Sequence, residues 1–152
     1  MIIVTGGAGF IGSNFLHHLT KVTDDEVVVL DNITYAANES YIPSQHKFIW
    51  CDISDAEHVE YIFNKVKPTK VFNFAAESHV DNSIKDVTPF ISTNITGTVN
   101  LLRSSVTHEV EKFHHISTDE VYGSLEYGEE GLFTEETPYD PRNPYSATKA
   151  AA

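Results

Sequence analysis

Cysteine is almost absent from this sequence, because Cys51 is the only one among 152 residues. A single thiol excludes an intrachain disulfide, a thiolate metal cluster and a secreted disulfide scaffold, and we expect no metal site. No segment approaches the roughly 18 consecutive apolar residues of a membrane span. The N-terminus also lacks the basic start of a signal peptide. We therefore expect a cytoplasmic protein with no membrane partner.

Basic residues are scarce as well. Lys and Arg number 10 against 22 Asp and Glu, which gives a formal net charge of −12. The basic surface that nucleic acid requires is missing, so no nucleic-acid partner is expected. A phosphate ligand would have to be held by backbone amides or by a helix N-terminus.

Short apolar segments alternate with helical patterns along the chain. Strands are expected at residues 1–5, 26–30, 47–51, 70–74 and 112–117. Helices are expected at residues 10–21, 55–66 and 89–106, with a further helix beginning at 144. Continuously apolar strands separated by helices are typical of parallel strands covered on both faces. The pattern predicts a doubly wound α/β sheet, the Rossmann fold, in one domain.

Helix starts and irregular segments complete this prediction. Ser54 is the expected N-cap of the helix at 55–66. Asn143 followed by Pro144 is typical of an N-cap and a first helical position. The segments 32–46 and 122–143 are expected to be irregular. The second exceeds the usual connection length, which indicates a functional loop.

Glycines at positions 6, 9 and 12 lie between the first expected strand and the first expected helix. In a dinucleotide-binding loop, Gly6 permits the tight turn, Gly9 lets the backbone approach a pyrophosphate, and Gly12 lets helix and strand pack closely. Asp31 follows Gly12 by 19 residues, at the tip of the second strand, where a carboxylate holds the adenine ribose hydroxyls. Asp31 would repel a 2′-phosphate, so the pattern predicts NAD rather than NADP. The alternative is a cluster of turn glycines.

The expected cofactor residues in this part of the chain are Gly6, Gly9, Phe10, Ile11, Gly12, Asp31, Asn32, Asp52 and Ile53. Asp52, at the tip of the third strand, is a candidate adenine contact. The alternative for Asp52 is a loop or helix-capping carboxylate.

Tyr145 and Lys149 form a second pattern. Their i, i+4 spacing places them on one face of a helix. A nearby ammonium stabilises a phenolate and so lowers the pKa of a tyrosine toward the range of a useful base. The alternative is a solvated helix face.

A third pattern, Thr118-Asp119-Glu120, follows the fifth strand, where open parallel sheets place their ligands. Thr118 can hydrogen-bond a reacting hydroxyl. The adjacent carboxylates Asp119 and Glu120 can divide the roles of acid and base. The alternative is an acidic pair that only stabilises a helix start.

Four segments together resemble the extended short-chain dehydrogenase/reductase family: Thr5–Ser13, Ala75–Asp81, Ser117–Gly123 and Tyr145–Lys149. Within this family the chain is most similar to the sugar-nucleotide 4,6-dehydratases, because related epimerases lack the Asp119-Glu120 pair. The resemblance implies NAD-dependent dehydration of a nucleoside-diphosphate glucose, first of all dTDP-glucose. The products would be water and the 4-keto-6-deoxy sugar nucleotide, formed by internal hydride transfer.

The resemblance also implies roles for the catalytic residues. Tyr145, as phenolate, would take the proton of the C4 hydroxyl, and Lys149 would hold the nicotinamide ribose. Thr118 would orient the C4 oxygen. Glu120 would remove the C5 proton, and Asp119 would protonate the leaving C6 hydroxyl.

Further positions follow from the same resemblance. Ala75 and Ala76 would pass the cofactor phosphates, and Glu77, Ser78 and His79 would face the substrate. His79 could equally be a loop histidine. Asn94 matches a helix asparagine near the active site, with a buried packing residue as the alternative.

Members of this family are roughly twice as long as the present chain. We therefore expect residues 1–152 to be the NAD-binding Rossmann domain, with the C-terminal substrate domain absent and a homodimer in a full-length form. A related epimerase or decarboxylase and a catalytically silent NAD-binding module stay open as alternatives.

Overall fold

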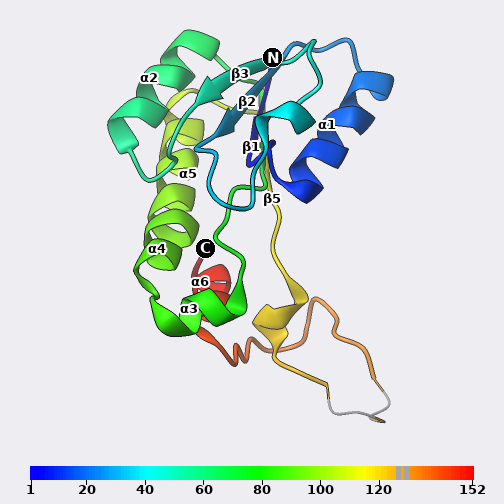
Figure 1. Cartoon of the computed structure of the whole chain (residues 1–152), viewed down its shortest axis with the longest axis vertical. Helices are drawn as coiled ribbons and strands as arrows, with labels where there is room; N and C mark the ends of the chain where they lie inside the picture. The colour runs from blue at the N-terminus through cyan, green and yellow to red at the C-terminus, as the bar shows by residue number, and fades with distance from the viewer. Residues whose placement is uncertain (126–127, 129–130) are drawn as a thin grey trace.

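The computed structural model describes residues 1–125, 128 and 131–152. Within them, a five-stranded sheet has the strand order β3-β2-β1-β4-β5 (Figure 1). Its strands are β1 (Ile2–Thr5), β2 (Val27–Asp31), β3 (Lys47–Trp50), β4 (Lys70–Asn73) and β5 (Lys112–His115). Each neighbouring pair is parallel. The expected parallel Rossmann-type sheet is confirmed.

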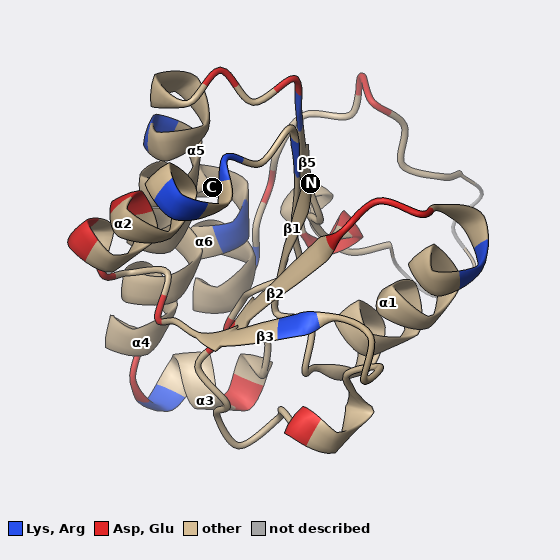
Figure 2. Cartoon of the chain, turned by 90° about the horizontal axis from the view of Figure 1, so that it is seen from above, with Lys and Arg blue, Asp and Glu red and all other residues tan. Residues whose placement is uncertain are grey.

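The α-helices are α1 (Phe10–Val22), α2 (Ala56–Val66), α3 (Val80–Lys85), α4 (Thr88–Phe90), α5 (Thr98–Thr107) and α6 (Pro144–Ala151). Three other helical segments are the 3₁₀-helices η1 (Glu39–Tyr41) and η3 (Asp119–Tyr122) and the π-helix η2 (Ile91–Gly97). Figure 2 shows α1 on one side of the sheet and α2 and α5 on the other. The sheet is therefore covered on both faces, as its apolar strands require.

Two apolar clusters fill these two layers. One contains Ile3 with Phe63 of α2 and Leu101 of α5. The other contains Val4 with Leu16 of α1. All five side chains are fully buried. Because successive side chains of a strand point to opposite faces, β1 supplies both clusters and leaves no position for a polar residue facing water.

The helix starts differ in one case from the sequence-based prediction. Asp55, not Ser54, is the N-cap of α2, since its Oδ1 accepts a hydrogen bond from the His58 amide at 3.0 Å. The amide of Ser54 instead donates to Oδ1 of Asp52 at 2.8 Å in the turn before the helix. The prediction for Asn143 is confirmed, because its side chain accepts from the Ser146 amide at the start of α6.

The expected helix over 89–106 forms as one helical stretch, α4–η2–α5, but its middle is a π-helix. Such segments occur frequently at functional sites. The helices α3, η1 and η3 were not predicted from the sequence, because they are too short to show a hydrophobic period. In the described part of the loop after η3, residues 123–125, 128 and 131–143 form no helix or strand, as expected.

Over the described residues, no helix has the length and apolar character of a membrane span. The same residues include no group of three or more His, Cys, Asp or Glu side chains arranged to hold a metal ion.

Candidate active site

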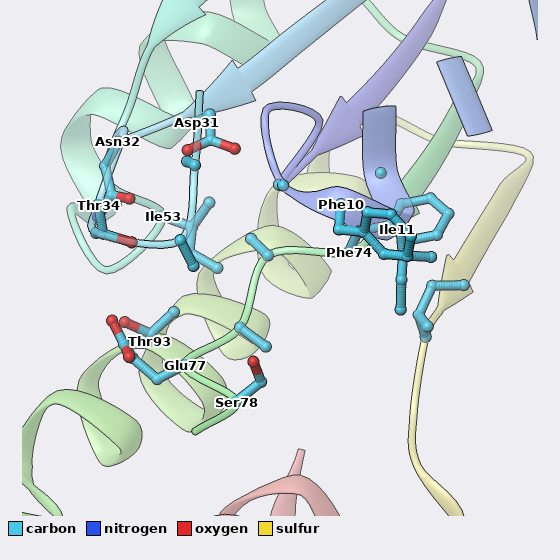
Figure 3. A pocket seen from close by; sticks show the side chains of 18 of the residues that line it. Phe10, Ile11, Asp31, Asn32, Thr34, Ile53, Phe74, Glu77, Ser78 and Thr93 are labelled. Carbon is cyan, nitrogen blue, oxygen red and sulfur yellow. The ribbon is translucent and has the colours of Figure 1, made fainter. Parts of the chain in front are cut away.

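A pocket of about 340 Å³ lies at the carboxyl ends of the strands, beside the N-terminus of α1 (Figure 3). It is the place where parallel α/β sheets bind ligands. The predicted site residues that line it are Gly6, Gly9, Phe10, Ile11, Gly12, Asp31, Asn32, Ile53, Ala75, Ala76, Ser78, Tyr145 and Lys149. One cavity thus joins the glycine loop to the tyrosine–lysine pair.

Glu77, and Ile116 and Ser117 directly before the third pattern, also line the pocket. The lining residues that were not predicted are Leu30, Thr34, Ala36, Ala37, Cys51, Phe74 and Thr93. Cys51 and Phe74 follow strand ends, so the strand assignment could have indicated them. Thr34 and Ala37 lie in an irregular segment whose path the sequence pattern does not reveal.

The glycine loop forms a backbone cradle with no space for side chains at two of its positions. Gly6 has a φ of +67°, and a Cβ there would lie 2.5 Å from the Ala75 nitrogen. A Cβ on Gly12 would lie 2.2 Å from the Gly6 carbonyl oxygen. A Cβ on Gly9 would lie 3.4 Å from its nearest neighbour, the Gly6 carbonyl oxygen, so a side chain would fit there. Gly9 lines the pocket, and the absence of a side chain leaves that space open to a ligand. Such a cradle at a helix N-terminus suits a diphosphate.

The Asp31 carboxylate is buried, with 7% of the residue exposed. Its Oδ2 accepts from the Ala8 amide at 3.0 Å, and its Oδ1 accepts from the Ile33 amide at 2.9 Å. A carboxylate has about four acceptor directions, so each oxygen still has capacity for a hydroxyl donor. The sequence has no Lys or Arg over 32–46 that would hold a 2′-phosphate there.

Asp52 is not among the lining residues, although its neighbour Ile53 is. Its Oδ1 accepts from the Ser54 amide in the turn before α2. This hydrogen bond is one that a loop carboxylate makes, and the adenine contact of Asp52 stays a prediction.

Tyr145 and Lys149 are both buried on α6, with 8% and 5% of each residue exposed. Lys149 Nζ donates to the Ile116 carbonyl at 2.7 Å and lies 3.4 Å from His115 Nε2. Burial lowers the pKa of Lys149 to about 8. It also lowers the pKa of His115 to about 4, with the Lys149 charge contributing.

The pKa of Tyr145 is raised, which corrects the expectation that Lys149 lowers it in this structure. Burial is the main cause, the charges of Glu120 and Asp119 add to it, and a hydrogen bond with Thr118 opposes it. The physical reason is that burial disfavours the charged phenolate.

The acidic pair lies at η3, packed beside α6 and outside the pocket lining. Thr118 Oγ1 accepts from the Glu120 amide at 3.3 Å as the N-cap of η3. Asp119 is exposed, whereas Glu120 is half-buried and its Oε2 accepts from Asn143 Nδ2 at 2.8 Å. The pair therefore begins a short helix, and its charges act on Tyr145. Its acid–base role stays a prediction.

Asn94, in the middle of η2, is buried and fully hydrogen-bonded. Its Nδ2 donates to the Glu77 carbonyl and to Thr148 Oγ1, each at 3.0 Å, and its Oδ1 accepts from the Glu77 amide at 2.9 Å. Asn94 thus fixes the segment after β4 against α6. His79, the N-cap of α3, is exposed and lies outside the pocket lining.

Three residues near the site were not predicted to act there. Asn73 Nδ2 lies 3.1 Å from His115 Nδ1, which in turn connects to Lys149. Asn143 was predicted only as a helix cap, yet it also contacts Glu120. Contacts between segments this far apart in sequence leave no signal in the local pattern.

Comparison with known proteins gives consistent results. The chain is 47% identical to the dTDP-glucose 4,6-dehydratase of Neisseria gonorrhoeae over 165 residues, which cover 99% of the chain and 47% of the relative. Streptomyces venezuelae DesIV, a dTDP-glucose 4,6-dehydratase solved with NAD and TYD bound, superposes with a TM-score of 0.90 at 42% identity, covering 99% of this chain and 48% of DesIV. The Thermus thermophilus UDP-glucose 4-epimerase complex with NAD also superposes with a TM-score of 0.90, at 37% identity. The match covers 99% of this chain and 47% of the epimerase.

The chain spans about half the length of the curated relatives it matches. Its parallel sheet agrees with the fold of the two solved relatives. A family model described as GDP-mannose 4,6 dehydratase matches residues 3–152, nearly the entire chain, and to that family the chain belongs.

Proposed function

We propose that this chain binds NAD and contributes the cofactor site and the acid–base residues of a sugar-nucleotide 4,6-dehydratase. The substrate class is a nucleoside-diphosphate glucose, in the first instance dTDP-glucose. The observation that carries the proposal is the placement of Tyr145 and Lys149 in the same pocket as Asp31 and the glycine loop. The acidic pair lies on η3, which packs against α6, and the Asp119 and Glu120 charges help to raise the pKa of Tyr145.

The pocket has the features that NAD requires. The glycine loop would hold the pyrophosphate against the N-terminus of α1. Asp31 would accept the adenine ribose hydroxyls, and Lys149 would hold the nicotinamide ribose. Bound NAD supplies a reversible two-electron acceptor. Of the relatives above, DesIV and the Thermus epimerase were solved with NAD.

The side chains around Tyr145 can supply the proton transfers. Tyr145 would remove the proton of the C4 hydroxyl, which Thr118 orients. A ketone at C4 makes the C5 proton acidic, and Glu120 would take this proton. Asp119 would protonate the C6 hydroxyl as it leaves, so that a proton and a hydroxide leave the sugar as water.

A 4-epimerase is the second candidate, because the Thermus epimerase has the same fold with a TM-score of 0.90. An epimerase needs no acid–base pair for loss of water. Asp119 and Glu120 at the site therefore favour the dehydratase.

A chain extended to the length of its relatives tests these roles by exchange of the sugar C5 proton with deuterated solvent. Tyr145→Phe should block oxidation and hence C5 exchange. Glu120→Gln should still form some C4 ketone but lose C5 exchange. Asp119→Asn should keep some exchange while elimination slows. Each loss should cost about 10²–10⁴-fold in rate. C5 exchange at the parent rate in the Glu120→Gln variant would refute the role of Glu120.

The 152-residue chain alone should not turn over dTDP-glucose, because the relatives have about twice its length. Without the rest of the substrate pocket, the positioning gain of roughly 7–11 kcal/mol is largely lost. The assay is the alkali-developed absorbance of the keto sugar after incubation with NAD. Clear product at catalytic protein levels would show that the substrate site is contained in these residues.

We also propose that a full-length form is a homodimer that uses the α4–η2–α5 stretch. Ile91, Val99, Leu102 and Val106 are large apolar residues that remain 39–80% exposed along it. An apolar stripe of this kind favours burial against a partner. Light scattering of the extended chain, with Val106→Asp as the disrupting variant, tests this assignment.

A further inference from the structure

Asn143 contacts two parts of the candidate site with one side chain. Its Oδ1 accepts from the Ser146 amide at 2.8 Å, which makes it the N-cap of α6. Its Nδ2 donates to Oε2 of Glu120, also at 2.8 Å. The start of the helix that carries Tyr145 is thereby joined to a carboxylate on η3.

Neighbouring contacts bring the same two segments together. The Asp140 amide donates to the Val121 carbonyl at 3.0 Å. Gly123 has a φ of +107°, and a Cβ on it would lie 3.1 Å from the Asp140 carbonyl oxygen. Figure 1 shows the chain leaving η3 and returning to α6 at this place. The contact between Asn143 and Glu120 is therefore one of several contacts between these two segments rather than an isolated surface contact.

The helix cap does not need the amide nitrogen of Asn143. Ser and Asp cap helices about as well as Asn through a single side-chain oxygen. The capping box is completed by Ser146 Oγ, which accepts from the Asn143 backbone amide at 3.1 Å. The Nδ2 group is thus free of the cap, and in this structure it donates to Glu120.

We propose that Asn143 is a positioning residue that holds the Glu120 carboxylate at a fixed place beside Tyr145. This inference rests on the proposed function, in which Glu120 is the base for the C5 proton. A hydrogen bond from a neutral amide to a carboxylate is stronger than one between neutral groups, so it can offset the rotamer freedom that Glu120 loses. Without it, the half-buried Glu120 would turn toward solvent.

The phenol of Tyr145 can report where Glu120 is. Its pKa is raised by burial first and then by the charges of Glu120 and Asp119, while the Thr118 hydrogen bond lowers it. Lys149, one helical turn further along α6, is the cation on the same helix. If Glu120 moves into solvent, its share of this effect falls and the Tyr145 pKa moves down toward its ordinary value.

The variant Asn143→Ser separates the two roles, because serine retains the cap and loses the donor to Glu120. Asn143→Ala removes both. On the 152-residue chain, Asn143→Ala should lower the melting temperature by about 2–4 °C, the expected loss for a cap in a domain of this size. Asn143→Ser should remain within about 1 °C of the parent, since a retained cap costs little.

Two magnetic resonance measurements on the same chain then test the contact. The Asn143 side-chain amide signals, identified by their loss in Asn143→Ser, should shift in Glu120→Ala and stay in place in the matched variant Asp119→Ala. The titration of Tyr145, followed through its ring Cζ signal, should move to lower pH in Asn143→Ser, as in Glu120→Gln. The double variant should move no further than Glu120→Gln alone, because both changes remove the same interaction.

An unchanged Tyr145 titration in Asn143→Ser, or equal amide shifts in the Asp119 and Glu120 variants, would overturn the inference and leave Asn143 as a helix cap. These results are distinct from a failure of the proposed function. That failure would appear as full C5 exchange in Glu120→Gln of the extended chain, whatever the Asn143 amide shows. If Glu120→Gln loses C5 exchange but the Tyr145 titration is unchanged in Asn143→Ser, only the positioning role of Asn143 is refuted.

Discussion

The Asp31 carboxylate accepts a hydrogen bond from the Ala8 amide across 23 residues of sequence, which ties the tip of β2 to the glycine loop. The same carboxylate accepts from the Ile33 amide, and Ile33 has a φ of +52°. A β-branched residue in this region is a backbone outlier that needs support from its surroundings. Asp31 therefore shapes the pocket as well as offering acceptors to a ligand.

This arrangement predicts a preference for NADH over NADPH. A 2′-phosphate next to Asp31 would meet a buried negative charge, and no Lys or Arg lies over 32–46 to compensate. We expect NADH to bind at least about tenfold more tightly, or roughly 1.4 kcal/mol. Fluorescence titration with both nucleotides gives the ratio. The isosteric Asp31→Asn variant should reduce the preference for NADH. Equal or tighter binding of NADPH by the parent protein would contradict the prediction.

Two glycines of one loop should respond differently to the same substitution. In Gly12→Ala the new Cβ would lie 2.2 Å from the Gly6 carbonyl oxygen, so the loop cannot keep its shape and the chain should be strongly destabilised. In Gly9→Ala the new Cβ would lie 3.4 Å from the Gly6 carbonyl oxygen, which is an ordinary van der Waals contact. We expect Gly9→Ala to fold with a near-parent melting temperature and to lose NADH affinity. Calorimetry and fluorescence titration separate the two effects, and normal NADH binding by Gly9→Ala would contradict a ligand role for that position.

Much of the site was predictable because it is encoded locally. The first strand, the three glycines after it and Asp31 follow one another at a characteristic spacing. The glycines and Asp31 all line the pocket. The spacing of Tyr145 and Lys149 places them on one helix face, and the glycine pattern in the same chain together with the family resemblance made the pair a specific prediction. The fold was predictable for a similar reason, since continuous apolar strands demand cover on both faces.

The remaining features depend on contacts between distant segments. The lowered pKa of His115 arises from burial beside Lys149, 34 positions away, and no local pattern reports it. The raised pKa of Tyr145 has the same kind of origin. Asp52 shows a related case, because its place at a strand tip predicts an adenine contact while the turn formed by its Oδ1 with the Ser54 amide could not be read from the sequence pattern.

Lys149 should give the folded chain a characteristic alkaline response. Burial lowers its pKa to about 8 from the usual 10.5. Between these values the unfolded chain still holds the proton and the folded chain has released it, so the free energy of unfolding should rise with pH. The rise is at most about 3 kcal/mol, and below pH 8 this residue contributes no pH dependence.

Urea unfolding of the parent and of Lys149→Met at pH 7 and pH 10 isolates this contribution as a difference between the two proteins. Lys149→Arg is the matched control, because arginine stays charged throughout and should show no such rise. A parent-minus-Met difference that is constant between the two pH values would show that Lys149 titrates normally.

Gly97, in the π-helix, packs directly against Ile53 at the edge of the pocket. A Cβ on Gly97 would lie 2.5 Å from both Cδ1 and Cγ1 of Ile53. Ile53 is 3% exposed and lines the pocket, so the only relief is to displace it toward the ligand space or to shift the helix. Gly97→Ala should therefore cost about 1–3 kcal/mol of stability through overpacking, and it should weaken NADH binding as well.

Removing the opposing side chain supplies the decisive comparison. Ile53→Ala alone should destabilise by about 2–5 kcal/mol through the cavity it leaves. In the double variant the new methyl group at 97 occupies part of that cavity, so the combined loss should be smaller than the sum of the two single losses. Urea unfolding of the four proteins measures this coupling, and NADH titration of the same set shows whether affinity lost in Gly97→Ala returns when Ile53 is shortened. Strict additivity in both measurements would mean that the helix shifts to make room, and that Ile53 does not transmit the change to the pocket.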